Sequence, residues 1–354
     1  MKVCGIVCEY NPFHYGHEYH IKKAKEVTNC DLMIAVMSGN FVQRGEPAIV
    51  DKWKRAEMAL KHGIDIVIEL PFIYATQSAK QFALGSMHLL NLIGCDCFCF
   101  GSESNNLDIL IECSKIELLN PDKTIAPVQS YEILYGKLNS NDILGINYIK
   151  YCKDMKPYCI QRSNHYFDEE IMGKISSATS IRKAVKSKED YSIATPMEIE
   201  DPVYLEDYYP MIQSLLHTLP KDYLKELFLM DEGIENLLVK NANYPTFNEF
   251  MEHSISKKYT RSKIQRTLIH LLNQTLKKTV NELELPTTVR LLGANEKGRK
   301  YLRNVECNVA SRFNQIEDEY RQMELKATQV YASIFDEEKR KQMKDDELRA
   351  PIFI

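Results

Sequence analysis

The sequence predicts an α/β protein in which a parallel β-sheet is covered by helices and is followed by a mainly α-helical C-terminal region. Apolar β-rich runs alternate with amphipathic helical runs over about the first hundred residues, which is the pattern of βα units. The β-rich runs almost vanish beyond about residue 190. The chain has 354 residues, enough for roughly two domains of about 150 residues each.

Each expected element follows from the local pattern. Strands are expected at the β-rich apolar runs, at residues 2–9, 31–38, 64–70 and 96–100. Helices are expected between them, at residues 16–27, 51–61 and 78–93. Because the strands are almost continuously apolar, we expect both of their faces to be buried. A mixed segment at 107–186 should hold a short strand at 158–161 and a helix that begins near Ser177, before helices at 215–229, 264–285 and 316–343.

Composition narrows the class of protein. The chain is 44% hydrophobic and 27% charged, which excludes a disordered chain and a small disulfide-stapled scaffold. No signal peptide is visible, and no run approaches the ~18 apolar residues that span a bilayer. We therefore expect a cytoplasmic protein without a membrane span. Cys95, Cys97 and Cys99 alternate along one expected strand, so we expect free, buried cysteines there rather than zinc ligands.

Positive charge is concentrated in one part of the chain. The net charge is −4, but residues 251–305 contain twelve Lys and Arg residues against four Asp and Glu residues. Helical geometry places one set of side chains opposite the apolar face of the expected helix, namely Lys263, Arg266, His270, Asn273 and Lys277. Arg299, in a later basic cluster, extends this stripe. Such a stripe can contact a nucleic-acid backbone; a solvated helix face is the alternative.

Polar segments stand at the carboxyl ends of three expected strands, at residues 9–14, 38–45 and 101–104. Ligands bind at this edge of a parallel sheet, so we expect the three segments to converge on one cleft. The first segment leads into Asn11-Pro12-Phe13-His14-Tyr15-Gly16-His17. A helix N-terminus at this point favours bound phosphate, and two histidines can stabilise charge on a phosphoryl group. The alternatives are a zinc site that includes His20 and surface histidines without a role.

A second segment has a similar character. Ser176-Ser177-Ala178-Thr179-Ser180-Ile181-Arg182 combines hydroxyl groups at an expected helix start with a cation. Ser177 and Thr179 can contact the β- and γ-phosphates of a nucleotide, and Arg182 can add charge-assisted hydrogen bonds. Simple N-capping of the helix is the alternative.

Together the two segments resemble the signatures of the His-x-Gly-His nucleotidyltransferase superfamily, whose members bind ATP there. A longer set of matches, over roughly residues 1–305, resembles the tRNA(Met) cytidine acetate ligase family. The matches are GIVCEYNPFH at 5–14, MSGNFVQRGEPA at 37–48, ELPF at 69–72, FGSE at 100–103, NDILGI at 141–146 and KYTR at 258–261. The resemblance implies a Rossmann-like nucleotidyltransferase domain at residues 1–190, which binds ATP and carries catalysis. A mainly helical, tRNA-binding domain would then occupy residues 191–354.

The resemblance also implies a reaction. In that family, ATP and acetate form acetyl-adenylate, and the acetyl group passes to N4 of the wobble cytidine of elongator tRNA(Met), which forms N4-acetylcytidine. His14, His17 and Arg182 would act in catalysis, with Mg²⁺ beside the triphosphate. The expected ATP-binding residues are Val7, Asn11, His14, Gly16, His17, His20, Gly101, Asn141, Arg162, Ser177 and Thr179. The expected tRNA contacts are Lys263, Arg266, Lys277 and Arg299.

Two other functions are compatible with the residues. The two nucleotidyltransferase signatures alone would equally permit a small-molecule adenylyltransferase. A non-catalytic RNA-binding protein that retains an ATP-binding fold is a third class. The large basic helical region argues against a small-molecule adenylyltransferase. The presence of both histidines argues against a non-catalytic RNA-binding protein. The sequence carries no signal for the base that activates the cytidine amine, for the metal ligands or for the oligomeric state.

Overall fold

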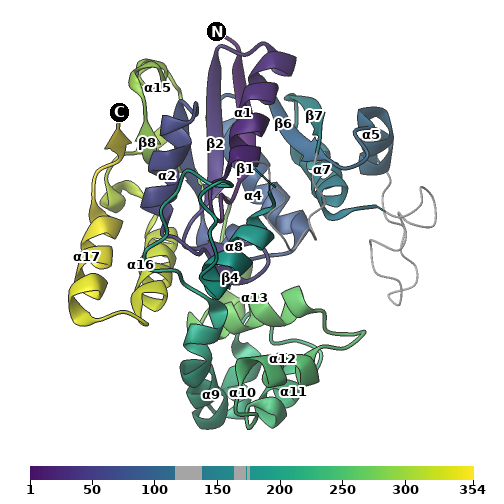
Figure 1. Cartoon of the computed structure of the whole chain (residues 1–354), viewed down its shortest axis with the longest axis vertical. Helices are drawn as coiled ribbons and strands as arrows, with labels where there is room; N and C mark the ends of the chain where they lie inside the picture. The colour runs from purple at the N-terminus through teal and green to yellow at the C-terminus, as the bar shows by residue number, and fades with distance from the viewer. Residues whose placement is uncertain (116–137, 163–172, 174–175) are drawn as a thin grey trace.

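A computed structural model describes residues 1–115, 138–162, 173 and 176–354. Among these residues the main sheet has eight strands, with β10, β8, β5, β2, β1, β6 and β7 side by side in that order and β9 paired to β8 (Figure 1). The strands are β1 Val3–Cys8, β2 Leu32–Ser38, β5 Ile66–Leu70, β6 Cys97–Ser102, β7 Lys156–Gln161, β8 Thr288–Ala294, β9 Asn308–Ala310 and β10 Ile352–Phe353. Strands β1, β2, β5, β6 and β7 run parallel, whereas β8 is antiparallel to β5. The predicted fold class is confirmed.

Helices cover both faces of this sheet. In strand β2, Leu32, Ile34 and Val36 belong to one hydrophobic core, whereas the residues between them belong to another, as the period of two requires. The first core includes side chains of α4 (Ala79–Leu92) and α7 (Ser140–Tyr151), and the second includes side chains of α1 (Tyr15–Thr28) and α2 (Lys52–Lys61). The other helices beside the sheet are α3 Phe72–Ala75, α5 Leu107–Lys115, α8 Ala178–Ser187, α15 Glu296–Leu302, α16 Asp318–Ala332 and α17 Glu337–Leu348. None of the described helices is long and apolar enough to cross a membrane.

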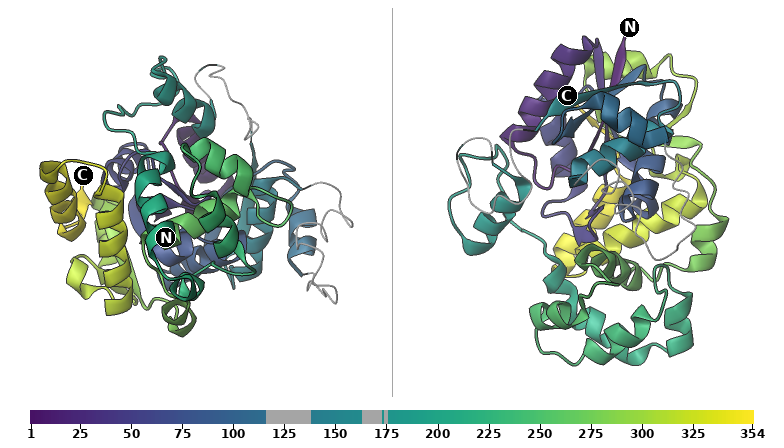
Figure 2. Two further views of the ribbon diagram at one scale, coloured as in Figure 1. Left: turned by 90° about the horizontal axis from the view of Figure 1, so that it is seen from below. Right: turned by 90° about the vertical axis from the view of Figure 1, so that its right-hand side faces the viewer.

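A separate group of helices, here called the helical unit, lies at one end of the sheet (Figures 1 and 2). It consists of η1 Leu205–Tyr208, α9 Tyr209–Thr218, α10 Lys221–Glu226, α11 Ile234–Asn241, α12 Phe247–Ser254, α13 Arg261–Leu272 and α14 Lys277–Glu282. All of these helices except α14 share a third hydrophobic core with α16, to which Tyr208, Leu238, Phe250 and Leu268 contribute. Val280 of α14 packs against the first core. The helical unit is therefore packed against the α/β part through α16.

The region after residue 190 is less uniformly helical than expected. Strands β8, β9 and β10 lie in it and return to the sheet built by the first half of the chain. A single cut at residue 190 thus does not separate the sheet from the helical unit. The expected helices at 215–229, 264–285 and 316–343 are each broken in the structure, by Leu219–Pro220, by residues 273–276 and by residues 333–336. Pro220, the N-cap residue of α10, separates the two helices because proline lacks the N–H that would continue α9.

Buried ion pairs join the end of the chain to the centre of the sheet. Lys52 Nζ lies 2.6 Å from Glu69 Oε1 and 2.8 Å from Glu347 Oε2. Arg290 Nη1 lies 2.6 Å from Glu69 Oε2 and 2.6 Å from Glu347 Oε1. All four side chains are almost fully buried. Burial, with the nearby Glu69 charge, raises the pKa of Glu324 beside them to about 8, so this carboxyl is mostly neutral at pH 7. The positive charges of Lys52 and Arg290 therefore balance the negative charges of Glu69 and Glu347.

Candidate active site

A cavity of about 380 Å³ opens at the carboxyl ends of β1 and β6. All three polar segments named from the sequence reach it, through Glu9, Gln43 and Gly101 among others. The cavity is also lined by the first turns of α7 and α8. Each residue that the sequence placed at an ATP site lines it, namely Val7, Asn11, His14, Gly16, His17, His20, Gly101, Asn141, Arg162, Ser177, Thr179 and Arg182. The predicted convergence on one cleft is confirmed.

His14 and His17 form the N-terminal cap of α1. Gly16 N–H donates to His14 Nδ1 at 3.1 Å, and His14 N–H donates to His17 Nδ1 at 3.2 Å. The two rings stack with their centroids 3.6 Å apart. Because both Nδ1 atoms accept a hydrogen bond, the neutral ring of each histidine carries its proton on Nε2. The cap therefore sets two Nε2–H donors beside a helix N-terminus, which is a site suited to phosphate.

The charge state of these histidines follows from their surroundings. Burial, together with Arg162 and Arg182, lowers the pKa of His14 to about 3. Burial and the neighbouring His14 lower the pKa of His17 well below its usual value, and burial with Arg162 lowers the pKa of His20 to about 4. The rings are neutral at pH 7, so they contribute N–H dipoles. The positive charge of the cavity comes from its arginines.

Arg182 ties α8 to the loop that follows β1. Its Nη1 donates to the carbonyl oxygen of Asn11 at 2.7 Å, and its Nη2 lies 3.4 Å from Thr179 Oγ1. Ser177 is the N-cap of α8, and its Oγ accepts from Ser180 N–H at 3.0 Å. The capping alternative for this segment is therefore observed, and it leaves α8 with its N-terminus at the cavity. A second helix start and a guanidinium thus face the same space.

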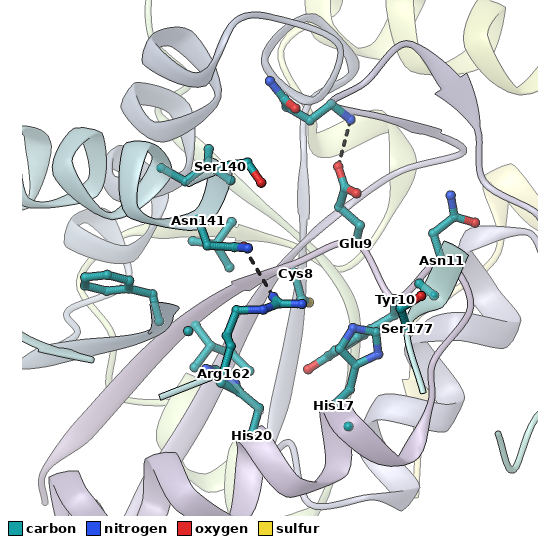
Figure 3. A pocket seen from close by; sticks show the side chains of 18 of the residues that line it. Cys8, Glu9, Tyr10, Asn11, His17, His20, Ser140, Asn141, Arg162 and Ser177 are labelled. Atoms are coloured by element: carbon teal, nitrogen blue, oxygen red, sulfur yellow. Dashed lines mark hydrogen bonds between the residues drawn. The ribbon is translucent and has the colours of Figure 1, made fainter. Parts of the chain in front are cut away.

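Asn141 and Arg162 form the opposite wall (Figure 3). Arg162 Nη1 donates to Asn141 Oδ1 at 3.3 Å, and Asn141 Nδ2 donates to Glu103 Oε1 at 2.5 Å. A Cβ atom at Gly101 would lie 3.0 Å from Arg162 Cγ. Glycine at position 101 therefore lets the Arg162 side chain lie directly over strand β6, with its guanidinium toward the cavity.

Three polar residues in and behind the cavity are not among the site residues named individually from the sequence. Glu9 and Arg44 line it, and both lie in segments that the sequence had placed at strand ends. Arg55 lies behind it, fully buried, and donates to the carbonyl oxygens of Glu9 at 2.5 Å and of Ser38 at 3.1 Å. A buried arginine that binds the ends of two strands is indistinguishable in the sequence from the other cations of an amphipathic helix.

The basic residues named from the sequence do not form one stripe. His270 and Asn273 are buried, because α13 is covered on this side too: His270 lies against the Phe72 ring, and its Nε2 is 3.2 Å from Thr76 Oγ1. Lys263 and Lys277 pair with Glu232 at 3.2 Å and with Asp231 at 2.7 Å. The prediction of an exposed, continuous stripe is therefore wrong.

Arg266 and Arg299 have different surroundings. Arg266 Nη1 donates to the carbonyl oxygen of Gln43 at 3.3 Å, and burial with the nearby Arg44 lowers the pKa of Arg266 to about 10. It joins the helical unit to the loop between β3 (Phe41–Val42) and β4 (Glu46–Pro47), at the edge of the cavity. Arg299 lies on α15, at the end of the molecule opposite the helical unit (Figure 1), because antiparallel β8 delivers the chain to the amino ends of the other strands.

The described cysteines are free thiols. Cys95, Cys97 and Cys99 are free and buried, as predicted. Among the residues that the structure describes, no group of three His, Cys, Asp or Glu side chains is placed to hold a metal ion. The cavity's donors instead suit an anion.

Comparisons with known proteins agree with this geometry. A family model described as HIGH Nucleotidyl Transferase matches residues 1–347. The tRNA(Met) cytidine acetate ligase of Caldanaerobacter subterraneus subsp. tengcongensis is 38% identical, with 94% of this chain and 95% of the relative covered. The protein of that name from Oceanobacillus iheyensis is 36% identical, with 100% of both chains covered.

Solved structures show the same likeness. The crystal structure of apo Thermotoga maritima TmcAL has a TM-score of 0.91 and 30% sequence identity, over 100% of both chains. The crystal structure of that protein bound with alpha-thio ATP has a TM-score of 0.87, at the same identity and coverage. From the match along almost the whole sequence and the shared fold, the chain belongs to the tRNA(Met) cytidine acetate ligase family of HIGH nucleotidyl transferases.

Proposed function

We propose that this protein uses ATP to convert acetate to acetyl-adenylate and transfers the acetyl group to N4 of the wobble cytidine of elongator tRNA(Met). The observation that carries the proposal is the cavity, in which the Nε2–H donors of His14 and His17 share one space with Arg162 and Arg182. The names of the relatives supply the acid and the RNA. The alpha-thio ATP complex of the Thermotoga protein supports ATP as the nucleotide.

The proposed activation step makes clear demands on the site. An acetate oxygen attacks the α-phosphorus of ATP, and the bond to the β-phosphate oxygen breaks to release pyrophosphate. Negative charge builds on the phosphoryl oxygens, so donors held in place before the reaction lower the barrier. We propose that the two histidines contact the α-phosphate. Arg162, Arg182 and the N-terminus of α8 at Ser177 and Thr179 would hold the rest of the triphosphate.

We propose that Mg²⁺ enters with the nucleotide. Mg²⁺ is commonly held by substrate phosphates, water and one or two carboxylates rather than by a protein cage. The described residues offer no such cage, so the triphosphate and water would supply most of the ligands of the ion, and no step above depends on it. Since ATP and tRNA are cytoplasmic substrates, we propose that the protein acts in the cytoplasm.

The proposal is tested by incubating the protein with ATP, radiolabelled acetate and bulk tRNA. We expect label in a cytidine of tRNA(Met), with none when ATP is omitted. If RNA stays unlabelled while ATP is cleaved to pyrophosphate with another acceptor, the small-molecule adenylyltransferase alternative replaces the proposal.

Replacement of Arg162 by alanine should weaken ATP binding. Its guanidinium lies at the cavity wall, held by Asn141, and a hydrogen bond to a charged group is worth about 1.5–3 kcal/mol, roughly 10- to 150-fold in Kd. Calorimetric titration with a non-hydrolysable ATP analogue measures the change. Arg162→Lys keeps the charge but lacks the planar guanidinium group, so its Kd for the ATP analogue should fall between those of the wild type and Arg162→Ala. An unchanged Kd in Arg162→Ala would remove this residue from the nucleotide site.

We propose that Lys263, Arg266 and Lys277 contribute to tRNA binding. Arg299 was predicted with them, but it lies at the other end of the molecule, on α15. Charge reversal of Lys263 and Lys277 together should weaken tRNA binding and reduce the slope of log K against log salt by about 2. The lost pairs with Glu232 and Asp231 are exposed ones, which are worth about 0–1 kcal/mol each, so the fold should persist. Arg299→Glu is the matched comparison. Equal effects of the two variants in filter-binding titrations would contradict a site localised on the helical unit.

A further inference from the structure

Among the described residues that line the cavity, Glu9 is the one that carries a carboxylate. We propose that Glu9 is the general base that accepts a proton from the cytidine N4 amine during acetyl transfer, an inference that rests on the proposed function. The first half-reaction needs no such base, because acetate is already an anion. The second half-reaction does, because the amine must lose a proton to become an amide.

The backbone holds Glu9 at a fixed position. It follows the last residue of β1, and its carbonyl oxygen accepts from the buried Arg55 at 2.5 Å. The next residue, Tyr10, has φ +49°, a left-handed conformation that a tyrosine adopts only where packing imposes it. The Tyr10 ring packs 4.9 Å from that of Phe13 and 4.8 Å from that of His17. The backbone of Glu9 is thus fixed one residue before Tyr10, whose ring contacts His17.

The side chain of Glu9 has one oxygen engaged and one available. Oε1 accepts from the backbone N–H of Gln43 at 2.8 Å, whereas no described residue donates a hydrogen bond to Oε2. Figure 3 shows Glu9 between the wall that holds Asn141 and Arg162 and the side that holds Asn11. Gln43 belongs to the loop that α13 of the helical unit contacts. Glu9 therefore lies between the nucleotide side of the cavity and the proposed RNA side.

The charges around Glu9 set its basicity. Burial raises the pKa of Glu9, the nearby Arg44 and Arg182 lower it in part, and Glu46 raises it further. Other titratable groups that interact with it are Cys8, Arg55 and Tyr148. A carboxylate with a raised pKa is a stronger proton acceptor than one in water.

The other cavity groups are poor proton acceptors. His14 and His17 carry their proton on Nε2 and accept backbone N–H bonds at Nδ1, so neither ring nitrogen is open for another proton. Burial raises the pKa of the Cys8 thiol and of the Tyr10 and Tyr148 phenols, which keeps all three protonated at neutral pH. The arginines are cations. His20 Nε2 has no hydrogen-bond partner among the described residues, but burial with the nearby Arg162 lowers the pKa of His20 to about 4. Since burial raises the pKa of Glu9 above its usual value, the Glu9 carboxylate is the strongest proton acceptor among these groups.

The proposed step balances. The N4 nitrogen forms a bond to the acetyl carbonyl carbon, and the bond from that carbon to the phosphate oxygen of AMP breaks. AMP leaves with the bonding electron pair as an anion. The nitrogen loses one proton to a Glu9 oxygen, and that proton passes to water when the product leaves. The products are N4-acetylcytidine, AMP and one proton.

The test separates the two half-reactions in Glu9→Gln, whose amide oxygen can still accept from Gln43 N–H. Synthetic acetyl-adenylate and elongator tRNA(Met) are supplied for single-turnover transfer, and acetate-dependent exchange of pyrophosphate into ATP is measured without tRNA. We expect transfer to be slower by about 100-fold or more, with exchange changed by less than about threefold. The wild-type transfer rate should rise with pH as Glu9 deprotonates and then level off, and Glu9→Gln should lack this rise.

Controls keep the outcomes distinct. Glu9→Asp retains a carboxylate and should transfer faster than Glu9→Gln, whereas Glu57→Gln, which removes an exposed charge on α2, should match the wild type. Normal transfer in Glu9→Gln overturns the inference. An equal loss of exchange and transfer also overturns it, because Glu9 would then bind ATP or its Mg²⁺. If the wild-type protein forms acetyl-adenylate but never acetylates tRNA, the proposed function itself fails.

Discussion

Replacement of either His14 or His17 by alanine should reduce acetate-dependent pyrophosphate exchange by about 100- to 1,000-fold. Each substitution removes an Nε2–H donor that we place at the α-phosphate, and loss of one such preorganised donor costs about 2.7–4 kcal/mol in comparable oxyanion sites. tRNA binding should stay nearly intact, because the helical unit has its own core. Exchange of radiolabelled pyrophosphate into ATP measures the first effect, and filter binding measures the second.

Matched variants separate chemistry from folding at this site. His14 also caps α1, and loss of a cap costs about 0.5–2 kcal/mol. His14→Asn supplies a good cap but no donor at the Nε2 position, so its Tm should exceed that of His14→Ala while its exchange rate stays low. His217→Ala, on an exposed position of α9, should behave as the wild type. Normal pyrophosphate release in either alanine variant would contradict the assigned role.

Replacement of Arg290 by methionine should lower the free energy of unfolding by about 3–5 kcal/mol. The change leaves Lys52 as the one cation against the buried carboxylates of Glu69 and Glu347, and removal of one partner from a buried ion pair carries a cost of that size. Urea titration followed by circular dichroism measures the effect, provided that a single transition is observed.

A surface arginine provides the comparison. Arg340→Met removes an exposed cation from α17, the helix that also carries Glu347, and should change the free energy of unfolding by less than about 0.5 kcal/mol. If Arg290→Met were as stable as Arg340→Met, the four buried charges would not be coupled as their distances indicate. Arg290→Lys should recover part of the loss, because it restores the charge without the second nitrogen, which donates to the carbonyl oxygen of Glu347.

The local pattern predicted most of the first half of the fold. Strand β2 fills its expected range to within a residue, because a fully apolar run can be satisfied only by burial on both faces. Asp51 and Ser177 were expected near helix starts and are N-caps that accept backbone N–H bonds. The pattern failed at β8, which carries the charged Arg290 within a buried strand, since the carboxylates that neutralise this charge come from distant parts of the chain.

Part of the candidate site could likewise be predicted from the sequence, and part could not. The His14–His17 segment could be named in advance because a strand, a turn and a helix start are consecutive in sequence, and their chemistry is local. The surroundings of the basic residues on α13 could not be predicted in this way. Periodicity identifies one apolar face of a helix, and the opposite face is then taken to be solvated. Phe72 and Thr76, which cover His270, are nearly two hundred residues away in the sequence.

The sequence by itself determined the alternation of strands and helices, the strand-end segments that form the cavity and the family to which the chain is similar. Only the tertiary structure decided that β8 returns to the sheet and that Lys52, Glu69, Arg290 and Glu347 neutralise one another. The physical reason is the range of the interactions. Capping, turn formation and the hydrophobic period act over a few residues, whereas burial, desolvation and charge pairing depend on groups that meet only when the whole chain has folded.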